Sequence, residues 1–357
     1  MHLSTPRLEI DVDRIAHNAR SIIAECGRHG VQVAAVTKVL RAHPALLRAL
    51  EQAQVSMVAD SRISNLRRCV ESGIGVPTML LRAPSLDEVS AAVRWADYSL
   101  NSSVETVRRL SQEAKFAGVR HKVVMMVDVG DLREGLWPEH VVEAVSAVSK
   151  LPNIEVAGLG TNLACYGGVV PSEENMAVLV RLLDECRAET GLPLELVSGG
   201  NSANLPLLKE GRMPAQINHL RIGEAICLGR NVIDRTPWPG TRQDTVRLVA
   251  AVVETERKPS IPLGPSGQDA FGNEPVFVDR GVRLRAICNI GRQDVPAEAL
   301  TPQDPGIYVL GASSDHLILD VTDAVEPVGL DSEVGFWLNY GGLAAASMSE
   351  DVQKIGV

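Results

Sequence analysis

The chain has 357 residues, of which 45% are hydrophobic and 22% are charged, and its formal net charge is -9. This length suffices for one large domain and a smaller one, and the composition is ordinary for a folded protein. The negative charge, without a local basic cluster, argues against a nucleic-acid partner. No apolar run approaches the roughly 18 residues of a membrane span, and the first residues lack the apolar core of a signal peptide. We therefore expect a cytoplasmic protein.

The cysteines indicate neither a disulfide framework nor a metal site. None of them stands in a Cys-x-x-Cys pair or at the spacing of a zinc site. Reduced thiols, as in the cytoplasm, are therefore expected. The six are Cys26, Cys69, Cys165, Cys186, Cys227 and Cys288.

The first two thirds of the chain alternate between short apolar runs and helical patterns. After an opening run at 8–12, eight runs qualify as strands: 33–38, 56–60, 77–82, 98–101, 122–129, 154–159, 194–198 and 218–222. Ser103 is placed to cap the helix that follows the fourth of them. Eight strand–helix units of this size predict a closed (β/α)₈ barrel over residues 13–235, with an open doubly wound sheet as the alternative.

The pattern changes at 234–240, where proline and glycine cluster and helical periodicity ends. Short β-type runs follow at 246–253, 275–278, 284–290, 306–310 and 317–321. They predict a smaller C-terminal β-rich domain over 244–357. Residues 1–12 are expected to join this domain, because the strand count of the barrel closes without them.

Lys38 ends the first predicted barrel strand, and a helix is expected over 40–50 with Pro44 near its first turn. The carboxyl ends of barrel strands are where active sites are built. Desolvation there would favour the neutral amine, which can form a Schiff base. The alternative is an ordinary lysine that reaches the solvent from a strand end.

Polar clusters follow four later strands, at 128–135, 160–168, 198–202 and 221–224. A glycine-rich turn that contains a serine, as at 198–202, exposes backbone N–H groups that can bind phosphate. Each cluster alone could be ordinary turn chemistry. A phosphate site together with a strand-end lysine suggests pyridoxal 5′-phosphate bound through a Schiff base.

Eight stretches, taken in order, resemble a known family. They are 35–39, 59–62, 130–135, 160–163, 198–202, 220–225, 269–272 and 313–316. In them the chain is similar to the fold type III pyridoxal-phosphate racemases, the alanine racemase superfamily, and most closely to its ornithine racemase-like branch. The resemblance implies a barrel followed by a β-rich domain. It also implies a head-to-tail homodimer with shared active sites.

The resemblance also implies roles for single residues. Lys38 would be the Schiff-base lysine and the proton carrier on one face of the substrate, and Arg221 would face the pyridine nitrogen. Arg133 would lie near the cofactor hydroxyl and the substrate carboxylate, although an ion pair is the alternative for both arginines. Asp315 would lie on a loop that reaches the partner's site. The remaining cofactor contacts would be Asn201, Ser202, Ile222 and Gly223, with Ser202 and the backbone at Gly223 on the phosphate.

Racemisation needs an acid/base group on each face of the substrate carbon. Where alanine racemases carry a tyrosine as the second group, this chain has Arg292, and arginine is a poor base. Likewise, Asn162 stands where those enzymes carry a histidine. We expect His316 to be the second group, with Cys165 and Tyr166 as alternatives. Cys165, Tyr166, Asp131 and Arg133 are also candidate substrate contacts.

The sequence thus predicts a racemase that interconverts the L and D forms of a basic amino acid such as ornithine. A cationic substrate side chain needs an acidic pocket end, for which four residues are available: Asp131, Glu134, Asp269 and Asp294. An alanine or broad-specificity racemase, a non-catalytic pyridoxal-phosphate homeostasis protein, and a related lyase or decarboxylase remain alternatives.

Overall fold

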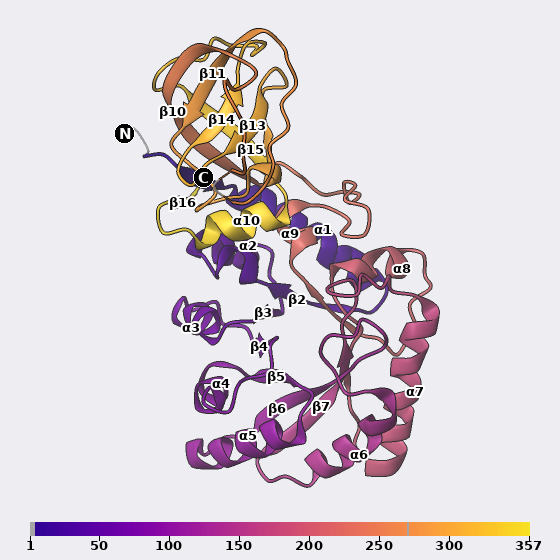
Figure 1. The fold of residues 1–357 in the computed structure, drawn as a ribbon. Helices are drawn as coiled ribbons and strands as arrows, with labels where there is room; N and C mark the ends of the chain where they lie inside the picture. The colour runs from indigo at the N-terminus through magenta and orange to yellow at the C-terminus, as the bar shows by residue number, and fades with distance from the viewer. Residues whose placement is uncertain (1–3, 270) are drawn as a thin grey trace. The chain divides into compact units, whose positions relative to one another are not determined.

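The computed structural model describes residues 4–269 and 271–357, so residues 1–3 of the predicted β-rich domain and Ala270 lie outside it. The chain forms two compact units (Figure 1). Val12–Gln243 forms one of them. The segment that ends at Asp11 and Asp244–Val357 form the other.

Eight parallel strands close into a barrel in the larger unit. They are β2 (Gln32–Val36), β3 (Met57–Asp60), β4 (Thr78–Leu80), β5 (Tyr98–Asn101), β6 (His121–Val127), β7 (Ile154–Thr161), β8 (Leu196–Ser198) and β9 (His219–Ile222). Each strand pairs with the next along the chain, and β2 pairs with β9 to close the ring. The predicted (β/α)₈ barrel is confirmed.

Helices lie outside the ring of strands, as Figure 1 shows for α3, α4, α5 and α7. The helices of this unit are α1 (Val12–Arg28), α2 (Pro44–Gln52), α3 (Ile63–Glu71), α4 (Val89–Trp95), α5 (Val104–Ala117), α6 (Pro138–Ser149), α7 (Glu173–Thr190), α8 (Leu205–Lys209) and α9 (Glu224–Leu228). Ser103 caps α5, because its side chain accepts from the Thr106 N–H, as predicted. Within the described residues, no helix has both the length and the apolar character needed to cross a membrane.

The strands are buried on both faces, which is why they read as continuous apolar runs. Alternate residues enter two separate clusters. On β6, Val124 and Met126 join the small cluster that fills the barrel, whereas Val123 and Met125 join the larger cluster shared with the helices. Ala34 of β2 belongs to the interior cluster, and it is the register neighbour of Arg221 on β9. Arg221 therefore faces the barrel interior.

The smaller unit is β-rich, as predicted. Its elements are β1 (Arg7–Ile10), β10 (Val246–Pro259), β11 (Val282–Cys288), β12 (Leu300–Pro302), β13 (Tyr308–Ala312), β14 (Leu317–Asp320), β15 (Glu333–Leu338), α10 (Tyr340–Met348) and β16 (Gln353–Gly356). The opening strand β1 pairs antiparallel with β10 and parallel with β16. The strand predicted at 275–278 is wrong: among the residues that the structure describes, these pair with no strand, and Val276 is 91% exposed.

Candidate active site

Lys38 lies just beyond the carboxyl end of β2, and its side chain is exposed. The expected desolvation of this amine is therefore wrong for the chain taken alone. The strand is shorter than predicted, and Lys38 begins a 3₁₀ turn that ends at Leu40. Arg41 and Ala42 follow with φ of 53° and 52°, so the helix expected from residue 40 starts only at Pro44. Left-handed backbone at two non-glycine residues is strained and typical of functional loops.

The end of β2 is tied to β3 by a buried hydrogen bond. Thr37 Oγ1 donates to Asp60 Oδ2 over 2.6 Å. The other carboxylate oxygen of Asp60 accepts from the Arg62 N–H at 2.9 Å and from Asn65 Nδ2 at 3.0 Å. Burial raises the pKa of Asp60, while these hydrogen bonds and the charge of Lys38 act in the opposite direction. The Lys38 amine is therefore close to a buried carboxylate, which fixes the backbone on which it stands.

A second carboxylate, at the neighbouring strand end, lies within electrostatic range of the same amine. Glu224 is the first residue of α9 and is separated from β9 by Gly223 alone. Burial raises the pKa of Glu224, and the nearby charges of Arg235 and Lys38 oppose this rise. Arg235 also donates a hydrogen bond to the Glu224 carboxylate. No role for Asp60 or Glu224 was predicted from the sequence.

Arg221 is buried, and its hydrogen bonds hold the guanidinium at the ends of three strands. Nη2 donates to Thr161 O at 2.8 Å and to Asn162 Oδ1 at 3.4 Å, and Nη1 donates to Ser198 Oγ. Burial lowers the pKa of Arg221 to about 10, so the group stays cationic at neutral pH. No ion pair to a carboxylate forms at Arg221 within the described chain, which disfavours the structural ion pair as its role.

Ser202 and Gly223 lie together at the ends of β8 and β9. Ser202 is buried at the start of a 3₁₀ turn, and its Oγ accepts from the Ala225 N–H at 3.4 Å. Gly200, before it, has a φ of 141°, and a Cβ there would lie 2.2 Å from Asn204 Oδ1. Glycine is thus required for this tight turn. Ile222 is 0% exposed, backbone included, in the chain taken alone.

Asn201 joins this turn to the loop after β7. Its Nδ2 donates to Asn162 Oδ1 at 3.1 Å and to Leu163 O at 2.8 Å, and its Oδ1 accepts from the Ala203 N–H at 2.8 Å. Asn162 Nδ2 is buried and has no hydrogen-bond partner in the described residues. An unsatisfied buried donor beside a guanidinium indicates that an acceptor from a ligand belongs here.

Arg133, Glu134 and Cys165 lie within electrostatic range of Arg221. Arg133 is exposed and pairs with Glu134 at 2.9 Å, so the ion pair considered for this arginine is present. Cys165 is exposed as a free thiol, with Sγ 3.6 Å from Asn201 Nδ2. Tyr166 is 78% exposed.

Asp131, a predicted substrate contact, holds a loop in the structure. It is 1% exposed, and its carboxylate accepts from three backbone N–H groups of the loop after β7. These belong to Cys165 (3.3 Å), Tyr166 (3.1 Å) and Val169 (3.3 Å). The carboxylate is thus engaged in holding this loop.

Asp131→Ala is expected to loosen the loop 162–170 and to cost about 1.5–3 kcal/mol of stability, because three backbone N–H groups lose a charged acceptor. Limited proteolysis should cut within this loop earlier than in the wild type, and urea unfolding should report the stability. Glu139→Ala, at an exposed position on α6, is the control. An unchanged cleavage pattern would contradict this role.

The other predicted residues belong to the smaller unit. Asp315 and His316 are exposed between β13 and β14, and Asp315 Oδ1 accepts from Gln293 Nε2 at 2.8 Å. The guanidinium of Arg292 lies 5.2 Å from the centre of the Phe271 ring. Asp269 and Asp294 accept hydrogen bonds within their own turns and from a nearby serine: Asp269 from the Phe271 and Asn273 N–H groups, Asp294 from Ser349 Oγ.

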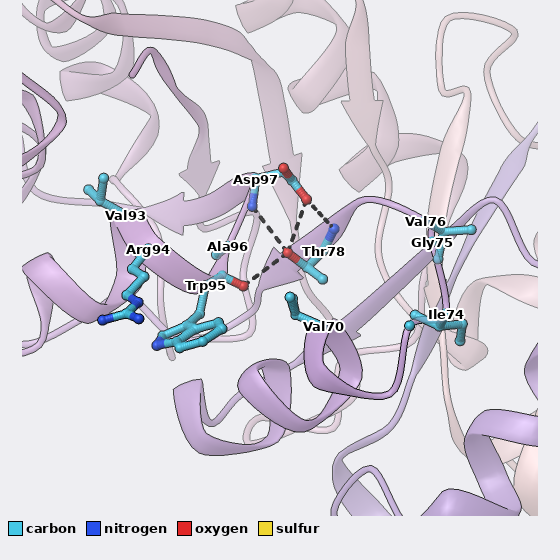
Figure 2. Close-up of a pocket in the computed structure, with 11 residues that line it drawn as sticks. Val70, Ile74, Gly75, Val76, Thr78, Val93, Arg94, Trp95, Ala96 and Asp97 are labelled. Carbon is cyan, nitrogen blue, oxygen red and sulfur yellow. Dashed lines mark hydrogen bonds between the residues drawn. The ribbon is translucent and has the colours of Figure 1, made fainter. Parts of the chain in front are cut away.

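Two cavities of the barrel unit hold none of the predicted site residues. The one in Figure 2, of about 360 Å³, lies beside Trp95, and there Asp97 accepts hydrogen bonds from the backbone and hydroxyl of Thr78. The other, of about 650 Å³, lies at the amino ends of strands and is lined by Tyr98 and Lys122. That end of a barrel usually serves stability rather than catalysis.

The closed barrel, with hydrogen-bond donors gathered at the carboxyl ends of its strands, defines the class of protein. Residues 10–231 match the family model "Alanine racemase, N-terminal domain". The chain belongs to the alanine racemase family, as its resemblance predicts.

Two curated relatives align with almost the whole chain. It is 40% identical to an ornithine racemase of Acetoanaerobium sticklandii, over 98% of this chain and 99% of the relative. It is 39% identical to a lysine racemase of Thermotoga maritima, over 98% of both chains. The predicted class of enzyme, an amino acid racemase, is thereby confirmed.

Among solved structures, the fold matches an alanine racemase of Bartonella henselae with covalently bound pyridoxal phosphate, at a TM-score of 0.74 and 18% identity. That match covers 99% of this chain and 100% of the other. At this identity the likeness concerns the fold alone.

Proposed function

We propose that this chain is a pyridoxal-phosphate-dependent racemase of basic amino acids. The observation that carries the proposal is the exposed Lys38 amine at the end of β2, beside a strand whose Arg221 is buried and cationic. The family membership and the two relatives, which are named for ornithine and lysine, support the same activity.

The residues present suit this cofactor. Lys38 can hold its aldehyde, Ser202 and the Gly223 backbone its phosphate, and the Arg221 guanidinium its ring nitrogen. The unsatisfied Asn162 Nδ2 adds a donor to a set that matches an acceptor-rich ligand. When bound, the cofactor supplies an electron-withdrawing group that makes the α-hydrogen of an amino acid acidic.

The proton is then handled by the protein's own groups. The Lys38 amine accepts it from one face of the substrate carbon, in the neighbourhood of the Asp60 and Glu224 carboxylates. A second group must donate on the other face, and we assign this role to His316, with Cys165 and Tyr166 as the alternatives in the barrel unit. The permanent charge of Arg221 keeps the ring nitrogen unprotonated, which favours return of the proton to the same carbon.

We assign the substrate as a class, the basic amino acids, rather than as one amino acid. Glu134 is the candidate acid that is not engaged in a turn, although it pairs with Arg133. Ornithine and lysine differ by one methylene, which a pocket discriminates by only about 1–3 kcal/mol. We therefore expect both to be turned over, and alanine to be a poorer substrate.

A head-to-tail homodimer is part of the proposal, with Asp315 and His316 of one protomer serving the site of its partner. Five of the six cysteines are buried free thiols, which suits a protein of the reducing cytoplasm. Light scattering after size exclusion tests the dimer.

The activity itself is tested by chiral chromatography after the purified protein and cofactor have been incubated with L-ornithine, L-lysine, L-arginine or L-alanine in heavy water. Racemisation should place deuterium at Cα without loss of carboxylate or side chain. Release of carbon dioxide or of a side-chain fragment would instead indicate a decarboxylase or lyase. The absence of any exchange would indicate a non-catalytic carrier.

A further inference from the structure

Two buried side chains lie directly behind Arg221. His219 stands two residues before it on β9, hence on the same face of the strand, and Ser198 ends the neighbouring β8. Ser198 Oγ lies 2.8 Å from His219 Nδ1 and accepts a hydrogen bond from Arg221 Nη1. Ser198 is 0% and His219 2% exposed, and His219 also borders the cavity of about 650 Å³ at the amino ends of the strands.

The direction of each hydrogen bond follows from chemistry. Because a guanidinium can only donate, Ser198 Oγ accepts from Arg221 and gives its own proton to His219 Nδ1. Burial, and after it the charge of Arg221, lowers the pKa of His219 to about 3, so the imidazole is neutral at working pH. Its remaining proton is assigned to Nε2, which is buried and has no hydrogen-bond partner in the described residues.

A histidine with one unsatisfied nitrogen is a costly way to fill a barrel interior, since an apolar side chain would leave no buried donor unpaired. What His219 does provide is an acceptor that fixes the Ser198 hydroxyl. That hydroxyl in turn accepts a hydrogen bond from Nη1 of the Arg221 guanidinium.

We propose that His219 is a positioning residue, which acts through Ser198 to fix the orientation of the Arg221 guanidinium and the N–H group that it presents to the cofactor. This inference rests on the proposed function, since it concerns the partner of the ring nitrogen. The hydrogen-bonded chain consists of His219 on β9, Ser198 on β8 and Arg221 on β9.

The barrel contains a matched control pair. Ser99 Oγ lies 2.8 Å from His121 Nε2, both residues are buried, and burial lowers the pKa of His121 to about 4. His121 alternates with Val123 and Met125 of β6, which pack in the layer shared with the helices. This serine–histidine pair therefore has the same chemistry and burial but lies on the outer face of the barrel strands.

The test compares His219→Leu with His121→Leu, each reconstituted with pyridoxal phosphate. Both should lower the melting temperature. Only His219→Leu should weaken cofactor binding, by about tenfold as for one lost charge-assisted hydrogen bond, in a fluorescence titration of the apoprotein. It should also increase the fraction of turnovers in which the amino group stays on the cofactor and the carbon skeleton leaves as a 2-oxo acid.

Ser198→Ala should reproduce the loss of cofactor affinity, whereas Ser198→Thr, which keeps the hydroxyl, should retain the wild-type affinity. If His219→Leu fails to fold, these two variants test the role of the hydroxyl instead. Equal cofactor affinity in the two histidine variants, or an unchanged affinity in Ser198→Ala, would overturn the role of His219. Failure of the wild type to bind the cofactor and racemise would instead refute the proposed function, before any variant is compared.

Discussion

Lys38→Ala is expected to abolish racemase activity and the visible absorbance of the bound cofactor together. The amine at this position both holds the cofactor aldehyde and carries the proton on one face of the substrate. Its removal should therefore lower turnover by about 10⁴-fold or more, the upper range for a single acid/base group. Absorbance spectra of the reconstituted protein and chiral chromatography measure the two losses on one sample.

Lys122→Ala is the control, because Lys122 is a barrel-strand lysine near the amino end of β6, where its Nζ donates to Tyr98 Oη at 3.2 Å. It should keep both the absorbance and the activity. A Lys38→Ala protein that retained an imine absorbance would show that another amine holds the cofactor. The assignment of Lys38 as the Schiff-base lysine would then be wrong.

The fold could be predicted largely from local pattern. A parallel barrel strand is apolar on both faces, and so β2, β6 and the others stand out as uninterrupted apolar runs between helical repeats. Their ends were placed less well: β4 has three residues where six were predicted. Strand ends depend on the register with the neighbouring strands, and the sequence of one strand does not reveal that register.

Two differences between the predicted and observed strands come from strand pairing. The run at 275–278 has strand-like composition but no partner strand within the described part of the chain, and a strand exists only where another strand pairs with it. Conversely, β16 (Gln353–Gly356) has a polar sequence and forms because it pairs with β1, nearly the whole chain away. The helix expected from residue 40 is delayed by the left-handed Arg41 and Ala42.

Some residues of the candidate site could likewise be predicted from local pattern, and others could not. Lys38, Arg221 and Ser202 could be selected because each lies at or shortly after the end of a strand, within a recognisable motif. Asp60, Glu224 and His219 could not, since their importance lies in contacts between strands. Asp131 illustrates the converse, because its acidic side chain suggested a substrate contact, whereas folding directs the carboxylate to the backbone of the next loop.

His316→Ala should lower racemisation in both directions by about 10²–10⁴-fold while leaving cofactor loading unchanged, because it removes the proton donor on one face only. In heavy water, the enantiomer whose α-hydrogen faces Lys38 should still exchange that hydrogen without inversion. Cys165→Ser and Tyr166→Phe are the matched comparisons. Should His316→Ala leave both directions of turnover unchanged, or Cys165→Ser show this pattern in its place, the histidine assignment is wrong.

Mixing the Lys38→Ala and His316→Ala proteins reveals where the histidine acts. In a symmetric dimer with shared sites, random exchange makes half of the dimers hybrids, and each hybrid has one site in which both residues are intact. About a quarter of the wild-type activity should therefore return on mixing. If each protomer used its own His316, no hybrid would contain an intact site and no activity would return. Recovery thus tests the second acid/base group and the head-to-tail dimer in a single measurement.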